Sequence, residues 1–550
     1  MEPIIECVPN FSEGRRPEVI KQITDVIETV AGVRLLNVDP GKATNRTVVT
    51  FVGSPEAVVE AAFQAIRKAG ELIDMRVHKG EHPRMGATDV CPLIPIAGIS
   101  MDETAVWARR LAERVGRDLQ IPVYLYEAAQ PEKRRNNLSV IRAGEYEGFF
   151  KKIKLPEWAP DYGPAEFDAR RGGTVIGARD FLVAYNVNLN TTSTRRANAI
   201  AFDVREAGRV IKEGSTSVQV PGTLKFVKAI GWYIDEYGIA QISMNLTNIR
   251  VTPVHAAFDE VCRAAAERGI RVTGSELVGL IPLQAMLDAG KYFLEKQQRS
   301  TGVSEKELIR IAILSMGLDE LGPFKPEERI IEYQLREAGA DKLVRMSLTD
   351  FADETASESP APGGGSISAY VGALGAALGT MVANLSAHKK GWDDRWKEFS
   401  DWAVRGQRYK DELLRLVDAD TRAFNGIMTA FALPKGNEAE KKLRHEAIQQ
   451  ATRAAIEVPY QVMESAFASL EVIRAMAAEG NPNSVSDAGV GALCARAAVL
   501  GAFLNVRINA AGYEDKGYVD DILGRGTAIM EKTISFEKDI LAIVNEKIGG

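Results

Sequence analysis

One short segment, residues 78–89, gathers side chains that could do acid–base chemistry. It holds His78 and His82, two of the five histidines in the chain, together with two acids, a lysine and an arginine. Histidine is the side chain best suited to proton transfer near neutral pH. Gly80 and Pro83 would break a helix here, so the spacing of the histidines does not predict a zinc site. Two interpretations stay open, a polar loop that caps a strand and a proton-transfer site.

Two aspartates are further candidates. Asp39 follows a β-branched run and precedes Pro-Gly, so it is either turn chemistry or part of a site where that strand ends. Asp420 lies inside an amphipathic helix, where aspartate is unfavourable, and a partly buried carboxyl there would have a raised pKa suited to acid–base work. Asp418, two residues earlier, points to another face of that helix. A capping or structural role fits Asp418 and Asp420 equally well.

Two glycine-bounded segments could bind anions. Residues 163–173 are too long and too charged for a tight turn, and three lysines lie just upstream, Lys151, Lys152 and Lys154. This positive area suits a substrate with carboxylates, although a solvated linker fits as well. Residues 360–366 precede a helix whose free amide groups could hold an anion, but they lack the Lys-Ser/Thr of a P-loop.

Composition excludes several classes of protein. Of 550 residues, 45% are apolar and 26% are charged, which is typical of a globular chain of several domains. A net charge of −6 argues against a protein that binds duplex nucleic acid. Four scattered cysteines exclude a disulfide framework and fit a reducing compartment. The N-terminus lacks signal-peptide features, and the most apolar stretch, 367–385, indicates a packed helix, so we expect a cytoplasmic protein without a membrane span.

The order of predicted elements indicates an α+β N-terminal half made of two ferredoxin-like βαββαβ subdomains. The first has predicted strands at 3–8, 33–38, 46–52 and 89–96, helices at 17–30 and 55–73, and an added helix at 103–117 and strand at 122–126. The second has predicted strands at 181–189, 224–232, 239–246 and from 269, with helices at 194–213 and 254–268. Two like subdomains side by side create a cleft, where small-molecule sites tend to lie.

From about residue 346 onward, helical spacing predicts an all-α helical-bundle domain. Its predicted helices are 374–385, 396–417, 440–457, 460–478 and 485–504. We therefore expect an N-terminal subdomain at 1–180, a second at 181–333, a linker at 334–345 and the helical domain at 346–550.

The whole chain resembles formiminotransferase-cyclodeaminase, the bifunctional folate enzyme of histidine degradation. In the first half the resemblance is carried by residues 7–14 (Cys-Val-Pro-Asn-Phe-Ser-Glu-Gly), 78–91, 142–147 (Arg-Ala-Gly-Glu-Tyr-Glu), 160–164, 231–232 and 329–333. In the second half it is carried by residues 361–366 (Ala-Pro-Gly-Gly-Gly-Ser) and 416–424. These motifs are long and span nearly the whole chain.

The resemblance implies that the N-terminal half transfers a formimino group from N-formimino-L-glutamate to tetrahydrofolate. The C-terminal half would close 5-formiminotetrahydrofolate to 5,10-methenyltetrahydrofolate and release ammonia. The family's transferase histidine falls on His82 and its cyclodeaminase aspartate on Asp420, while Asp39 is a further candidate from its loop position. The family's folate-binding stretch falls on Gly163, Pro164, Ala165, Glu166, Phe167, Asp168, Ala169, Arg170, Arg171 and Gly172. Residues 168–171 are this sequence's own departure from the family's pattern.

The resemblance also implies a polyglutamylated tetrahydrofolate co-substrate, no metal, no nucleic-acid or membrane partner, and a homo-octamer. Candidates for a basic track that holds the polyglutamate tail are Lys151, Lys152, Lys154, Arg170 and Arg171. Two alternatives stay open: an N-formylglutamate-type transferase with weak or absent cyclodeaminase activity, and a non-catalytic folate-binding oligomer. The presence of His82 and Asp420 in their motifs speaks against the second.

Overall fold

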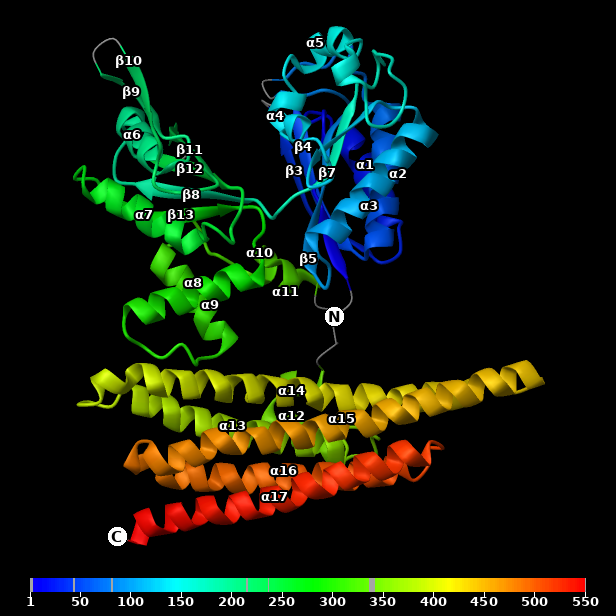
Figure 1. Ribbon diagram of the computed structural model, residues 1–550, viewed down its shortest axis with the longest axis vertical. Coiled ribbons are helices and arrows are strands. Elements are labelled where there is room, and N and C mark those ends of the chain that lie inside the picture. Colours follow the sequence, from blue (N-terminus) through cyan, green and yellow to red (C-terminus); the bar gives the residue numbers. More distant parts are fainter. Residues whose placement is uncertain are drawn as a thin grey trace. The chain divides into compact units, whose positions relative to one another are not determined.

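The computed structural model describes residues 3–42, 45–80, 83–213, 216–235, 237–335 and 342–549. The chain folds into two compact units (Figure 1). One is formed by Met1–Ala285 with Met316–Leu335, and the other by Met286–Ser315 with Arg336–Gly550. The four domain bounds given above stay predictions, and residues 336–341 of the predicted linker lie outside the described part of the chain.

The first sheet has the strand order β1-β4-β2-β5-β7-β6, with β3 beside β4. Its strands are β1 (Ile4–Cys7), β2 (Asn10–Phe11), β3 (Val33–Gly41), β4 (Arg46–Gly53), β5 (Thr88–Ala97), β6 (Val123–Glu127) and β7 (Thr174–Ala178). β1 pairs antiparallel with both β4 and β5, which is the pairing of a βαββαβ unit. β7 and β6 then continue the sheet in parallel from β5. Sequence analysis predicted β6 but missed β7.

Side chains of this sheet alternate between two faces, as a pleated strand requires. Cys91 and Ile176 pack into a core with helices α1 (Pro17–Glu28), α2 (Pro55–Leu72) and α3 (Met101–Arg114). Val90 and Val175, their neighbours in the chain, face the other way and pack near Phe149 of α5. On that side, α4 (Leu138–Ile141) and α5 (Glu145–Lys152) cover only part of the sheet (Figure 1). The uncovered part is where a ligand can reach the strands.

The second subdomain repeats the same order, with the sheet β11-β12-β8-β13 and antiparallel neighbours throughout. Its elements are β8 (Val183–Leu189), α6 (Thr194–Val204), β9 (Arg209–Glu213), β10 (Thr216–Val220), β11 (Val227–Ile234), β12 (Ile239–Leu246), α7 (Val254–Ala266) and β13 (Val272–Val278). The helix predicted at 194–213 was wrong beyond Val204. The helix ends at Val204 because Arg205 has an extended backbone, and the chain then passes Gly208, whose φ of 58° is left-handed, into the β9–β10 hairpin.

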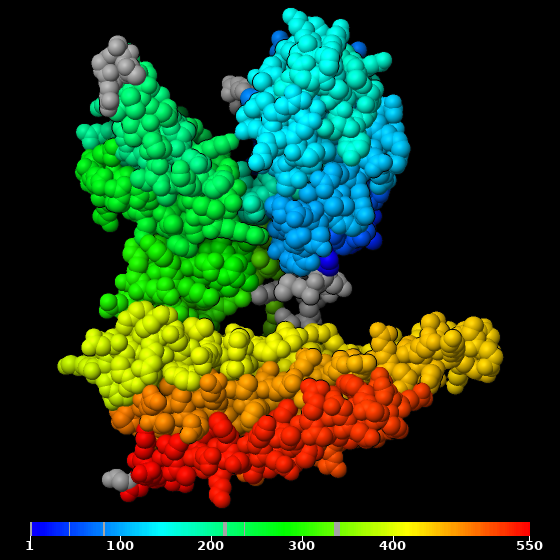
Figure 2. All heavy atoms as spheres, in the orientation of Figure 1, coloured from blue at the N-terminus to red at the C-terminus, as the bar shows by residue number. Residues whose placement is uncertain are grey.

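The remaining elements are helical. They are α8 (Leu283–Lys296), α9 (Glu305–Met316), α10 (Pro326–Arg329), α11 (Ile331–Leu335), α12 (Leu348–Thr355), α13 (Gly364–Ala387), α14 (Trp396–Ala432), α15 (Glu438–Glu479), α16 (Val485–Ala510) and α17 (Lys516–Gly549). Helices α13–α17 pack lengthwise into one bundle (Figure 1), whose atoms are coloured yellow-green to red in Figure 2. The predicted fold class, an α+β N-terminal half with an all-α C-terminal bundle, is confirmed.

Two details of the bundle bear on the predictions. The separate helices predicted at 440–457 and 460–478 are one helix, α15, which continues through the buried Pro459 because packing along 42 residues outweighs one lost hydrogen bond. Among the described residues, Gly364–Ala387 and Pro482–Ala510 are long and apolar enough to cross a membrane by length and composition. In the most apolar window of each, 61% and 50% of the residues are buried inside the protein.

Candidate active sites

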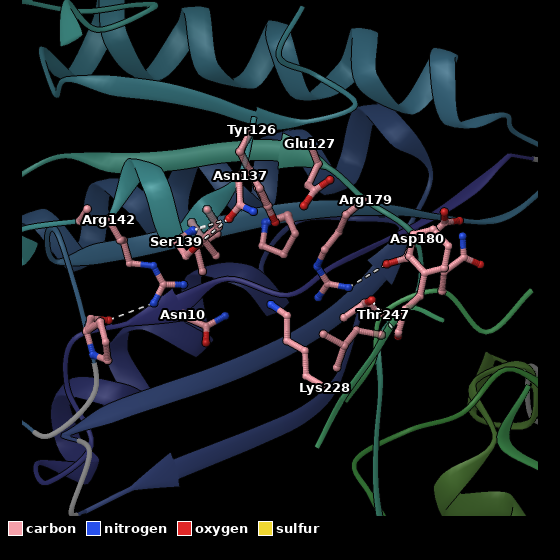
Figure 3. Close-up of a pocket in the computed structure, with 18 of the residues that line it drawn as sticks. Asn10, Tyr126, Glu127, Asn137, Ser139, Arg142, Arg179, Asp180, Lys228 and Thr247 are labelled. Atoms are coloured by element: carbon pink, nitrogen blue, oxygen red, sulfur yellow. Dashed lines mark hydrogen bonds between the residues drawn. The ribbon is translucent and has the colours of Figure 1, made fainter. Parts of the chain in front are cut away.

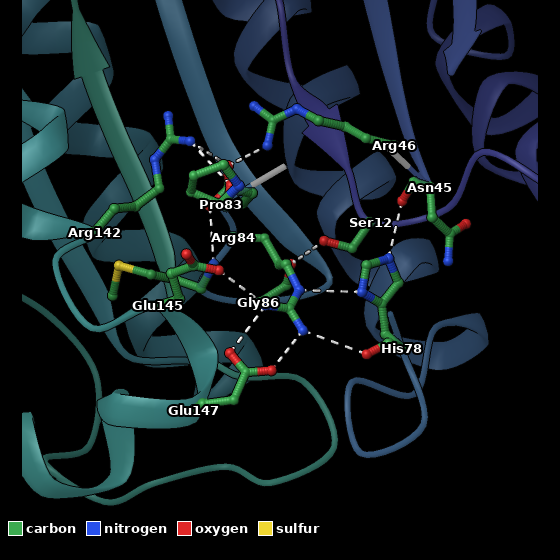
Figure 4. A network of polar contacts seen from close by, with 12 residues as sticks. Ser12, Asn45, Arg46, His78, Pro83, Arg84, Gly86, Arg142, Glu145 and Glu147 are labelled. Atoms are coloured by element: carbon green, nitrogen blue, oxygen red, sulfur yellow. Dashed lines mark hydrogen bonds and ion pairs between the residues drawn. The ribbon is translucent and has the colours of Figure 1, made fainter. Parts of the chain in front are cut away.

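His78 anchors the segment that follows α2 (Figure 4). Its Nε2 lies 2.9 Å from the carbonyl oxygen of Asn45, and its Nδ1 accepts a hydrogen bond from Nε of Arg84 at 3.3 Å. A ring that donates from one nitrogen and accepts at the other is neutral. Burial lowers the pKa of His78, which favours the same form. Both nitrogens are thus occupied, and His78 has a structural role.

Arg84 joins the same segment to α5. Its nearly buried guanidinium lies 3.1 Å from a carboxylate oxygen of Glu145 and 2.7 Å from one of Glu147. The Ser12 hydroxyl donates to the carbonyl of Gly86 at 2.7 Å. These contacts fix the chain on the C-terminal side of His82 (Figure 4). His82, the predicted transferase histidine, lies outside the described residues.

A pocket of about 740 Å³ lies on the uncovered face of the first sheet and extends to residues of the second subdomain (Figure 3). Residues of β2, β5 and β6 contribute Asn10, Val90, Pro92 and Tyr126 to its lining. The charged lining residues are Arg46, Glu127, Arg142, Glu145, Arg179, Asp180 and Lys228. Pro83, the residue after His82, also lines it. The predicted cleft is therefore present, and the histidine segment leads into it.

A buried carboxylate holds two arginines at this pocket. Asp89 is fully buried, and its Oδ2 pairs with Nη1 of Arg46 and lies 3.4 Å from Nη1 of Arg142. Its Oδ1 accepts the amide of Met85 at 3.0 Å, and Nε of Arg46 donates to Oδ1 of Asn10 at 2.9 Å. Two guanidiniums around one carboxylate leave a positive charge uncompensated within this group. The pocket wall therefore favours an anionic ligand.

Asp39, the second predicted transferase residue, is exposed on β3, where it pairs across the ladder with Val48 of β4. It does not line the pocket described above. Asn45 and Arg46, which follow it closely in the sequence, contribute instead to the contacts around His78 and Asp89.

Residues 163–172, the predicted folate-binding stretch, use their charged side chains within the N-terminal subdomain. Arg171 pairs with Asp168 at 2.5 Å, and Arg170 donates to the carbonyl of Glu71 at 2.7 Å. The described pocket is lined by none of the residues of this stretch.

Lys152, another residue of the predicted basic track, is occupied in the same way. Its Nζ donates to the carbonyls of Val140, Ile141 and Ala143 at 2.9, 2.7 and 3.2 Å. Burial lowers the pKa of Lys152 to about 8. Of the five predicted track residues, Lys152, Arg170 and Arg171 thus bind the protein's own groups, whereas Lys151 and Lys154 are exposed.

Acid should destabilise the N-terminal unit through His78. The pKa of His78 is lowered in the folded chain from its ordinary value of 6.5, so the unfolded chain takes up the proton first. This part of the stability is full above the ordinary pKa and is lost as the pH falls toward the folded-state pKa. We expect the free energy of unfolding, measured in urea at about pH 7.5 and about pH 5.5, to fall less in His78→Gln than in the wild type. An equal fall in both proteins would contradict this role.

The C-terminal unit places Asp420 against the N-terminus of α13. Oδ2 of Asp420 accepts the hydroxyl of Ser366 at 3.0 Å. A Cβ at Gly365 would collide with the Asp420 carboxylate, so only glycine allows this approach. Burial raises the pKa of the Asp420 carboxyl, and hydrogen bonds from the Ser366 hydroxyl and amide lower it part of the way. The anion at the glycine-rich helix start is thus the protein's own carboxylate.

Asp418 has a different role. It is buried and accepts the amides of Leu343 and Val344 at 2.9 and 3.3 Å, which ties the segment before α12 to α14. Asp418 and Asp420 therefore face different neighbours, as their spacing predicts. Asp418 is structural, and Asp420 remains available for proton transfer with a raised pKa.

Comparison with known proteins covers both units. Residues 4–179 match the family model of the formiminotransferase domain, N-terminal subdomain, residues 184–336 match the formiminotransferase domain, and residues 347–526 match formiminotransferase-cyclodeaminase. A formimidoyltransferase-cyclodeaminase of Gallus gallus is 43% identical over 548 residues, which is 100% of each chain. The chain belongs to the formimidoyltransferase-cyclodeaminase family.

Two further relatives each match only part of this chain. A glutamate formimidoyltransferase of Thermoplasma acidophilum is 43% identical over 294 residues, 53% of this chain and 92% of that protein. A methenyltetrahydrofolate cyclohydrolase of Methylorubrum extorquens is 32% identical over 202 residues, 37% of this chain and 97% of that protein. Each of these relatives is thus matched over nearly its whole length by part of this chain.

Sequence reasoning did not single out the group formed by Arg46, Asp89 and Arg142 in the transferase half. The three lie far apart in the sequence, and only the pairing of β2 with both β4 and β5 brings Arg46 near Asp89. The sequence signal that could have indicated this group is a charged residue near the start of two apolar strands, Arg46 in β4 and Asp89 in β5.

Proposed function

We propose that this chain transfers the formimino group from N-formimino-L-glutamate to tetrahydrofolate and then cyclises 5-formiminotetrahydrofolate to 5,10-methenyltetrahydrofolate with release of ammonia. The observation that carries the proposal is the match, over the full length of both chains, to a relative named for both activities. In the transferase half, the pocket lined by Pro83 can hold a substrate. In the cyclodeaminase half, the Asp420 carboxyl can exchange protons.

In the transfer step, nitrogen 5 of the folate attacks the amidine carbon of the donor. The tetrahedral adduct then collapses, and the bond from this carbon to the glutamate nitrogen breaks. A proton must leave nitrogen 5, and another must reach the departing glutamate nitrogen. We assign both transfers to His82, because one imidazole can accept and then return a proton. Pro83 lines the pocket beside this position, and Asp39 is a weaker candidate for orienting the imidazole.

In the cyclisation step, nitrogen 10 attacks the same carbon and ammonia departs. Asp420 is the proposed acid–base group, because its carboxyl has a pKa raised by burial and a hydrogen bond that orients it. Tetrahydrofolate is the carrier in both steps. Residues 163–172 stay the proposed folate-binding stretch, on the strength of the family resemblance.

Finer features of the proposal follow the family resemblance as well. They are a polyglutamylated folate, a homo-octamer, a cytoplasmic location and the domain bounds predicted above. Negative-stain imaging of the purified chain tests the octamer.

Mixing the purified full-length chain with formiminoglutamate and tetrahydrofolate tests the function directly. We expect the near-ultraviolet absorbance of methenyltetrahydrofolate to appear together with one ammonia per turnover. N-formylglutamate offered as the donor separates the main alternative, because formyl transfer yields 5-formyltetrahydrofolate and no ammonia. A higher kcat/KM for the formyl donor would overturn the proposal.

A further inference from the structure

Arg142 has an incomplete set of hydrogen bonds at the wall of the pocket. Its Nη1 donates to the carbonyl of Pro83 at 3.0 Å and lies 3.4 Å from Asp89. Its Nε is buried and has no hydrogen-bond partner within the described part of the chain. Only 13% of the Arg142 side chain is exposed, yet the residue lines the pocket (Figure 3). A buried donor without an acceptor is unfavourable, so Nε of Arg142 remains able to donate a hydrogen bond to a ligand in the pocket.

The geometry of the guanidinium indicates which acceptor fits. Nε and Nη2 form one edge of the planar fork, and this edge matches the two oxygens of a carboxylate. The protein's own contacts use Nη1 and leave that edge without a partner among the described residues. Oδ2 of Asp89 contacts Nη1 of both Arg142 and Arg46, so the guanidinium of Arg142 is held in place before a ligand binds.

Acidic groups at the pocket do not neutralise this edge. Glu145 pairs with Arg84 at 3.1 Å. Glu127 lies near Arg179 and Lys228, whose positive charges oppose its own. Asp180 also lines the pocket at that end, where Arg179 and Lys228 offset its charge together with that of Glu127.

We propose that Arg142 binds a carboxylate of the formimino donor and is a specificity-determining residue of the transferase site. The inference rests on the proposed transfer from formiminoglutamate. The carboxylate that Arg142 binds is assigned to the formimino donor and not to the glutamate tail of the folate, for a chemical reason. The glutamate carboxylates lie within a few bonds of the nitrogen that leaves, whereas the folate tail lies beyond the aminobenzoyl ring from nitrogen 5. Arg142 bonds to Pro83, the residue next to the proposed proton shuttle, so its ligand lies near the reacting atoms.

Steady-state kinetics of the full-length Arg142→Gln and Arg142→Lys variants test this assignment. Three donors are compared: formiminoglutamate and its two monoamides, each of which lacks one charged carboxylate. We expect Arg142→Gln to raise the KM for formiminoglutamate by about 10- to 100-fold, the effect of losing one charge-assisted pair, and the KM for tetrahydrofolate by less than about 3-fold. Arg142→Lys should lie between, because it keeps the charge but not the fork.

The monoamides provide the decisive comparison. Wild-type protein should prefer formiminoglutamate over one monoamide by about 10-fold or more in kcat/KM, and Arg142→Gln should lose that preference. The matched control is Arg117→Gln, an exposed arginine of the same subdomain, which should keep wild-type constants. Cyclisation of supplied 5-formiminotetrahydrofolate should stay unchanged in every variant, which reports that the C-terminal unit is folded.

Four results would overturn the assignment. Two concern the constants of Arg142→Gln: a rise confined to the KM for tetrahydrofolate, or a fall in kcat with an unchanged KM for the donor. The other two concern the preference for the dicarboxylate: that it persists in Arg142→Gln, or that the wild type lacks it. A wild-type chain that fails to use formiminoglutamate at all would overturn the proposed transferase function instead.

Discussion

Replacing His82 with alanine should abolish formimino transfer and leave cyclisation intact. Loss of a general acid–base group typically costs about 10²- to 10⁴-fold in rate. Transfer needs one proton to leave nitrogen 5 of the folate and another to reach the glutamate nitrogen. His78, the other histidine of this segment, has both ring nitrogens occupied by Asn45 and Arg84. We therefore expect no neighbouring histidine to replace His82. The measurement is formation of methenyltetrahydrofolate from formiminoglutamate and tetrahydrofolate, compared with its formation from supplied 5-formiminotetrahydrofolate.

The matched control for this variant is His445→Ala. His445 is an exposed histidine of α15 that pairs with Glu514 at 3.1 Å, so its removal should change neither activity. Persistence of transfer in His82→Ala at a rate near that of the wild type would show that the shuttle is another group. A parallel loss of both activities would indicate misfolding rather than a lost shuttle.

The fold was predictable where local pattern and tertiary structure agree. Alternating apolar runs and turn residues predicted both βαββαβ units. One face of each sheet packs on helices, and burial of that face makes every second residue of a strand apolar. β7 was missed because it is a short strand with Gly177 near its end, and it joins the sheet through pairing with β5 and β6. Val210 and Ile211 of β9 fit the apolar spacing of a helix, and the extended backbone of Arg205, which ends α6, has no distinct sequence signal.

The candidate sites divide in the same way. The spacing of Asp418 and Asp420 was enough to predict different faces of one helix, because helix geometry is local. The contacts of Arg46 and Arg142 with Asp89 were not predictable, since they depend on strand register and on the path of a loop. The positive area predicted from residues 163–173 and the lysines upstream did not reveal that Asp168 would pair with Arg171 or that a backbone carbonyl would bind Arg170.

Replacing Asp420 with asparagine should stop cyclisation while transfer continues, so that 5-formiminotetrahydrofolate accumulates. The substitution keeps the shape of the side chain and removes its ability to exchange a proton, a change that typically costs about 10²- to 10⁴-fold. The measurements are ammonia release and methenyl absorbance after supply of the 5-formimino compound. Glu412→Gln, a partly exposed acid of the same helix, is the matched control and should keep both activities. Normal methenyl formation in Asp420→Asn would make the carboxylate a structural cap of α13.

The pH dependence of cyclisation separates a catalytic carboxyl from a capping one. Burial raises the pKa of Asp420 above its ordinary 3.8, so the wild-type rate should show an inflection above that value. Ser366 donates to the carboxylate at 3.0 Å and stabilises its charged form, so Ser366→Ala should move the inflection to still higher pH. A carboxyl that only caps the helix would give the same pH profile in wild type and Ser366→Ala, because the rate would not depend on its protonation. A shift that follows the lost hydrogen bond would tie the observed titration to Asp420 itself.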